Sequence, residues 1–212
     1  MNLSLYDRRC KPGHAHQLSC TSGLTAPAFA GRLPSLGVTT QPHPVSSIQV
    51  TTIPAGALLE RYSASGDYTD CYVAKFQGQA SLAEFMAAFY TTPIFKFERW
   101  VLARFLSHPS TDHEALLLAQ GQLSRFAAWH VESRQSNQVI MAAGRTRSWL
   151  MVSQPPVGSG ATALFFGSAV VQRKRGGFGW QFSALVGIHK LYSRILLASA
   201  ARRLAKGRGQ SA

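Results

Sequence analysis

Apolar and polar side chains alternate with a period of two residues from Leu123 to about residue 172, and this pattern constrains the fold most. It is broken at three places whose compositions are typical of hairpin turns: Gln135-Ser136-Asn137, Gly144 and Gly158-Ser159-Gly160. The pattern therefore predicts an antiparallel meander of four strands, at about 125–134, 138–143, 145–153 and 161–172. A sheet with one apolar face needs another element to cover it.

The C-terminal part of the chain supplies a candidate cover, a long helix that starts near Trp180. At 100° per residue, its apolar residues fall on one broad arc: Leu185, Ile188, Leu191, Tyr192, Ile195 and Leu196. An arc this wide indicates a largely buried helix. After Ala201 the apolar face ends, and we expect a fraying tail.

Strands and two short helices are predicted before the meander. A strand begins near Ile48, and a second covers 68–76 with Tyr68, Tyr72, Ala74 and Phe76 on one face. Ser81 and Glu84 form a capping box that starts one helix, and Pro93 starts another that ends near Ser107. The fold class is therefore α+β, with a domain over 46–205, a poorly ordered extension over 1–45 and a basic tail over 206–212.

The order of these elements resembles the helix-grip fold of the START and SRPBCC-like superfamily. The chain also resembles an uncharacterised bacterial family of domains of unknown function, through 67–70, 89–96, 145–150, 166–170 and 189–194. The resemblance implies a sheet that wraps the last helix and leaves a cavity between them. It implies no known activity, so no catalytic residue is carried over.

Acidic residues are absent after Glu132, although 12 Lys or Arg side chains follow. The first 132 residues carry a net charge of +1 and the last 80 carry +12, which favours an anionic partner such as nucleic acid or an anionic membrane surface. His189, Lys190 and Arg194 interrupt the most apolar helix, so we expect no membrane span. Three cysteines without paired spacing favour a reducing, cytoplasmic location.

Several side chains could orient a ligand in the expected cavity. His130, Glu132 and Arg134 would form a polar row if their face of the strand points inward, or an ordinary wet face if it does not. Arg145 and Arg147 could hold a carboxylate or phosphate, or could protect an exposed edge. The ligand-binding candidates are Trp129, His130, Glu132, Arg145, Arg147, Trp149, His189 and Tyr192.

Other features of the sequence give weaker evidence about function. Asp67 and Asp70 lie three residues apart, which puts them on opposite faces of a strand, and turn chemistry is the favoured interpretation. The loop Arg173-Lys174-Arg175 with Trp180 could contact an anion or a membrane surface, or could be a solvated connection. No His or Cys pair has metal-ligand spacing, so we expect no metal and no cofactor.

Three functions remain open from the sequence. We favour a cytoplasmic binding module that holds an apolar or amphipathic small molecule between the sheet and the last helix. The alternative is a surface that binds nucleic acid or anionic membranes through the basic C-terminal third. A cavity-based enzyme of the cyclase or hydrolase type is a third hypothesis, for which the sequence offers no residue set.

Overall fold

A computed structural model describes residues 47–106, 109–154, 160–172 and 180–209, which all belong to one compact unit over Thr39–Ala212. The N-terminal extension predicted over 1–45 and the basic loop 173–175 lie outside the described residues, and so do the side-chain contacts of Trp180. None of the described helices combines the length and the apolar character that crossing a bilayer requires.

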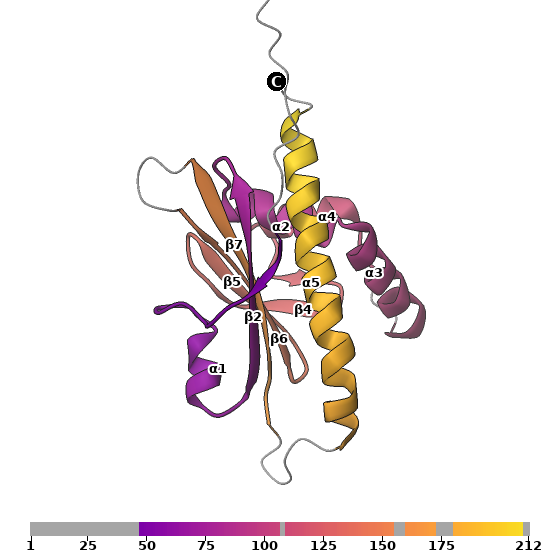
Figure 1. The fold of residues 1–212 in the computed structure, drawn as a ribbon. Coiled ribbons are helices and arrows are strands. Elements are labelled where there is room, and N and C mark those ends of the chain that lie inside the picture. The colour runs from indigo at the N-terminus through magenta and orange to yellow at the C-terminus, as the bar shows by residue number, and fades with distance from the viewer. Residues whose placement is uncertain (1–46, 107–108, 155–159, 173–179, 210–212) are drawn as a thin grey trace, which may run out of the picture. The chain divides into compact units, whose positions relative to one another are not determined.

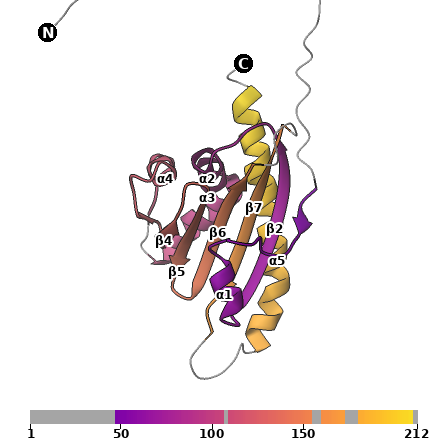
Figure 2. The ribbon, with the colours of Figure 1, turned by 90° about the vertical axis from the view of Figure 1, so that its left-hand side faces the viewer.

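The described strands form one antiparallel sheet, in the order β1-β2-β7-β6-β5-β4-β3 (Figure 2). Their bounds are β1 Gln49–Val50, β2 Tyr68–Gln77, β3 Arg125–Phe126, β4 Trp129–Arg134, β5 Gln138–Ala143, β6 Thr146–Ser153 and β7 Ala161–Val170. The predicted meander is confirmed, except that its first strand is divided. Ala127 has a φ of +51°, and the chain turns there so that β3 pairs back onto β4.

Within the described residues, five helices accompany the sheet: α1 Glu60–Ala64, α2 Leu82–Tyr90, α3 Pro93–Leu106, α4 Asp112–Ala119 and α5 Trp180–Gly209. The capping box that Ser81 and Glu84 form at α2 is present, as the sequence indicated. Helix α4 was not predicted, although Thr111 and Glu114 form an identical capping box at its start.

Helix α5 packs with α2 on one face of the sheet, which we call the inner face; α1 lies on the opposite, outer face (Figures 1 and 2). The inner core joins side chains of β2, β5, β6 and β7 to those of α2 and α5, whereas the outer core is smaller and surrounds Trp149. This antiparallel sheet against a long C-terminal helix is the helix-grip arrangement, and the predicted fold class is confirmed.

Burial along α5 differs from the predicted arc in two ways. Ile188, Leu191 and Ile195 are 68%, 60% and 44% exposed, so part of the arc faces away from the sheet. The buried side chains lie further along the helix: Ser193, Leu196, Leu197, Ala200, Ala201 and Leu204. The prediction of fraying after Ala201 was wrong, because small residues let the helix approach α2 and the sheet closely over its last turns.

Candidate functional site

A cavity of about 250 Å³ lies between the inner face of the sheet, α2, α3 and α5. Aromatic rings form much of its wall, namely Phe89, Phe95, Trp129, Phe166 and Tyr192. Polar and charged side chains add to the wall, namely Glu98, Thr146, Arg147, Ser148, Ser168 and His189, and Ala143 and Leu196 complete it. A pocket with an apolar wall and a few converging polar groups has the usual composition of a small-molecule site.

A hydrogen-bonded cluster of Asp70, Ser168 and His189 closes the sheet side of the cavity. The register of β2 and β7 sets Asp70 directly opposite Ser168. The Asp70 carboxylate accepts from the Ser168 backbone N–H at 3.0 Å and from its hydroxyl at 2.7 Å. His189 Nε2 lies 2.8 Å from Ser168 Oγ and 3.5 Å from Asp70 Oδ2. Helix α5 therefore brings His189 against the Asp70 carboxylate of the inner face.

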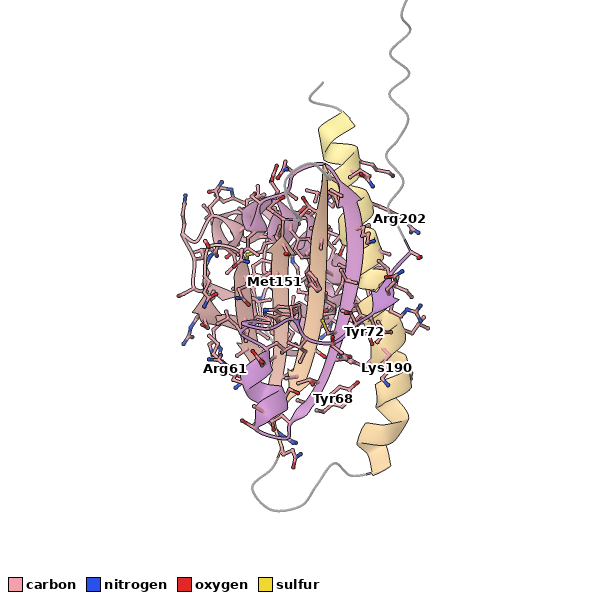
Figure 3. All side chains as sticks on the ribbon, turned by 60° about the vertical axis from the view of Figure 1, so that its left-hand side comes forward. Arg61, Tyr68, Tyr72, Met151, Lys190 and Arg202 are labelled. Atoms are coloured by element: carbon pink, nitrogen blue, oxygen red, sulfur yellow. The ribbon has the colours of Figure 1, made fainter. Side chains whose placement is uncertain are left out.

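Two tyrosines flank this carboxylate along β2. Tyr68 and Tyr72 each place a hydroxyl 3.4 Å from Asp70 Oδ2, from the side of the sheet that α5 covers (Figure 3). Burial and the Asp70 charge raise the pKa of Tyr68 to about 12, and the pKa of Tyr72 is raised for the same two reasons. Both hydroxyls therefore stay protonated at neutral pH and donate toward Asp70, whose side chain is only 7% exposed.

The cluster does not have the geometry of a nucleophilic Ser-His-Asp triad. In such a triad the serine donates to one imidazole nitrogen and the aspartate binds the other. Here Ser168 donates its one hydroxyl hydrogen to Asp70, so His189 Nε2–H is the donor to Ser168 Oγ. Asp70 also approaches that same nitrogen. The arrangement fixes the position of the imidazole and leaves the serine without an imidazole base.

The opposite wall of the cavity carries a partly buried carboxyl group, that of Glu98 on α3. The Tyr192 hydroxyl of α5 donates a hydrogen bond to it. Burial raises the pKa of Glu98, and the bond from Tyr192 opposes that shift only in part. The pKa of Tyr192 is itself raised, by burial first and then by the Glu98 charge. The pair joins α3 to α5 across the cavity.

One hydrogen-bond donor of the cavity wall has no partner within the described part of the protein. The indole Nε1 of Trp129 is buried, and no described acceptor lies within reach of it. A buried donor without a partner costs about 1–3 kcal/mol, so such groups are usually satisfied by water or by a ligand. Trp129 is therefore a residue of the cavity wall whose side chain holds an unsatisfied buried donor.

The remaining sequence candidates divide between the cavity and the outer face. Trp129, Arg147, His189 and Tyr192 are among the lining residues. The Arg147 guanidinium, however, forms an ion pair with Glu132, and its Nε donates to Tyr62 Oη at 2.9 Å. Arg61 of α1 also pairs with Glu132, as part of this outer-face cluster. Arg147 thus contributes to the cavity without offering it a free charge.

His130, Arg145 and Trp149 do not reach the cavity. His130 is exposed, and Arg145 donates from Nε to the carbonyl of Val171 at 2.7 Å. Trp149 is fully buried in the outer core, where its Nε1 donates to Gln138 Oε1 at 3.0 Å. The anion site imagined around Arg145 and Arg147 therefore does not assemble, because the strand period directs Arg147 and Trp149 to the outer face.

A β-bulge between Val131 and Ser133 breaks the polar row expected on β4. The extra residue turns Arg134 away from the face that carries His130 and Glu132. The Arg134 guanidinium instead donates to the carbonyls of Leu118, at 2.8 Å, and Ala119, at the C-terminal end of α4. Arg134 is thus a helix cap and does not orient a ligand.

Three polar residues of the site were not among the ligand-binding candidates selected from the sequence: Asp70, Glu98 and Ser168. The period of β2 held a signal for Asp70, because a face that includes Tyr68 and Tyr72 must also include the residue midway between them. Glu98 and Ser168 carried no comparable signal, since each depends on the packing of α5. No described group of three His, Cys, Asp or Glu side chains has a metal-binding arrangement.

No protein-family model matches the chain, and no curated protein matches it significantly. The resemblance to an uncharacterised bacterial family therefore stays a prediction. Among solved structures, the chain is similar to the crystal structure of CalU16 from Micromonospora echinospora, at 12% sequence identity and a TM-score of 0.33. That match covers 81% of this chain and 96% of the other. With so low a TM-score, the fold assignment depends on the strand order and the position of α5.

Proposed function

We propose that this protein binds a small amphipathic molecule in the cavity between the sheet and α5. The observation that carries the proposal is the division of the cavity wall. Aromatic rings of α2, α3, β4 and β7 can cover an apolar body, while Trp129 Nε1, Glu98 and the His189 cluster can orient polar atoms.

The volume of the cavity limits the size of the ligand. About 250 Å³ is the space of about eight liquid waters, at roughly 30 Å³ each. A molecule with a single ring and a short polar arm fits this space, whereas the acyl chains of a membrane lipid do not. The proposal is thus narrower than the lipid-like ligand that a helix-grip fold alone would allow.

A blocking variant tests the proposal. Thr146 lies in the cavity wall, and Thr146→Trp should fill the space; Arg145→Trp, one residue earlier and exposed, is the matched control. We would measure 2-phenylethanol binding by isothermal titration calorimetry. We would also examine co-purifying molecules by native mass spectrometry with organic extraction. Binding by wild type and Arg145→Trp, lost in Thr146→Trp, is the expected result. Equal binding by all three proteins, or by none, contradicts the proposal.

The basic C-terminal third gives weaker support to a polyanion surface than its charge suggested. Arg134 caps α4, Arg145 binds the carbonyl of Val171, and Arg147 pairs with Glu132. These guanidinium groups are committed to contacts within the protein, which lowers the number available to phosphates.

A further inference from the structure

We propose that the ligand of this cavity is a small organic ammonium ion, with its charged nitrogen beside the Glu98 carboxylate and among the aromatic rings of the wall. This inference rests on the proposed function and adds the chemical class of the ligand. Its two supports are a partly buried carboxyl group that has no cation beside it among the described residues, and a wall rich in ring faces.

Glu98 has no ion-pair partner within the described residues. Its carboxylate accepts a hydrogen bond from the hydroxyl of Tyr192, a neutral donor. A buried carboxylate is costly unless a cation pairs with it or a proton neutralises it. Glu98 also lines the cavity, so a bound ammonium ion could supply the missing positive charge without any rearrangement of the protein.

The rings of the wall favour the same charge. Phe89, Phe95, Trp129, Phe166 and Tyr192 enclose the cavity beside Glu98. The face of an aromatic ring carries partial negative charge and attracts an ammonium group, most strongly where water is excluded. The same rings can cover the apolar part of the ligand. A carboxylate joined to several ring faces is a combination that stabilises organic cations.

An anionic ligand would find no comparable support. The two basic residues of the lining are Arg147, whose guanidinium pairs with Glu132 on the outer face, and His189, which is hydrogen-bonded within the Asp70 cluster. An anion would therefore meet the Glu98 carboxyl group in the cavity wall without a free cation to offset it.

Three probes of similar size and different charge separate these possibilities: 2-phenylethylammonium, 2-phenylethanol and phenylacetate. We would measure their dissociation constants by isothermal titration calorimetry at pH 7.5. We expect the ammonium ion to bind at least about tenfold more tightly than the alcohol, and phenylacetate to bind most weakly. The variant Glu98→Gln removes the charge and keeps an acceptor for Tyr192. It should abolish the advantage of the ammonium ion over 2-phenylethanol.

The matched control is Glu60→Gln, which removes the same charge from the exposed helix α1, away from the cavity lining, and should preserve the order of the probes. If none of the probes binds to the wild type, the proposed function fails together with this inference. If 2-phenylethanol binds but the ammonium ion binds no better, or if phenylacetate binds best, the inference fails and the proposed function stands. An undiminished preference for the ammonium ion in Glu98→Gln overturns the role given to Glu98.

Discussion

Asp70 of β2 accepts both the backbone N–H and the hydroxyl of Ser168 on β7, so one buried carboxylate joins two strands whose pairing residues are 98 positions apart. Because the same carboxylate faces His189, it also ties the sheet to α5. Its removal should therefore weaken the fold as well as the site.

Asp70→Ala should lower the free energy of unfolding by about 2–3 kcal/mol, because it leaves the Ser168 donors and two tyrosine hydroxyls without their acceptor. Urea denaturation measures this cost. Asp67→Ala is the control, since Asp67 accepts one bond, from the exposed backbone N–H of Gln172, and its loss should cost under about 1 kcal/mol. An equal loss of unfolding free energy in the two variants would show that Asp70 acts only as a turn residue.

The stability of the protein should depend on Glu98 in a defined range of pH. Burial raises the folded-state pKa of Glu98 above the ordinary value of 4.5, so its contribution is fully present below pH 4.5 and is lost as the pH rises through the raised value. Tyr192 of α5 and Tyr90 of α2 are the titratable groups that face it, and both stay neutral there. Glu98→Gln should therefore gain stability over the wild type as the pH increases from 4 to 8. Urea denaturation at several pH values checks this, and a difference that is constant with pH would contradict it.

Gly167 of β7 should tolerate no side chain. A Cβ at this position would lie 2.6 Å from Leu59 Cδ2 and 2.7 Å from the backbone oxygen of Asp70. Gly167→Ala should cost about 3 kcal/mol, as overpacking of a core does. Gly187→Ala is the control: it lies in α5 with open space around it and should stabilise the protein by about 0.5–1 kcal/mol. Thermal unfolding of both variants measures the contrast, and a neutral Gly167→Ala would refute the packing argument.

Cys71 should be unreactive in the folded protein. It is 2% exposed, and burial together with the Asp70 charge raises the pKa of its thiol to about 12. In a Cys10→Ser/Cys20→Ser variant, we expect Ellman's reagent at pH 8 to modify Cys71 at least about a hundredfold more slowly than in the same protein unfolded in urea. Rapid modification under native conditions would show that the outer core opens readily.

The sheet could be predicted from the sequence because its signals are local. The period of two residues and the glycine turns located β5, β6 and β7, and Ser81 with Glu84 located the start of α2. Two details of the same region could not be predicted from the sequence, and both are irregularities of the strands. The positive φ of Ala127 and the bulge after Val131 leave no mark in the alternation, yet the bulge decides where Arg134 points.

The site could be predicted only in part, since it depends on how distant elements pack. His189 and Tyr192 were found because they lie beside the apolar arc of the last helix. Glu98 was missed because α3 had to be placed against α5 before its burial could be known. Arg147 lies beside the cavity, as expected, but its guanidinium points to the outer face of the sheet and pairs with Glu132. A shift of one residue in the strand register decides which face a side chain occupies.

The pairing of β2 with β7 also sets the order of events during synthesis. Strand β2 (Tyr68–Gln77) cannot pair with β7 (Ala161–Val170) until β7 has been synthesised. The ribosome therefore adds about 90 residues before that edge of β2 is paired. At roughly 5–20 residues per second, the wait lasts about 5–20 seconds. Helix α5 follows β7 in the chain, so it can close over the inner face only after that pairing. The cavity is therefore completed by α5, and a nascent chain that stops short of this helix has a sheet but no cavity.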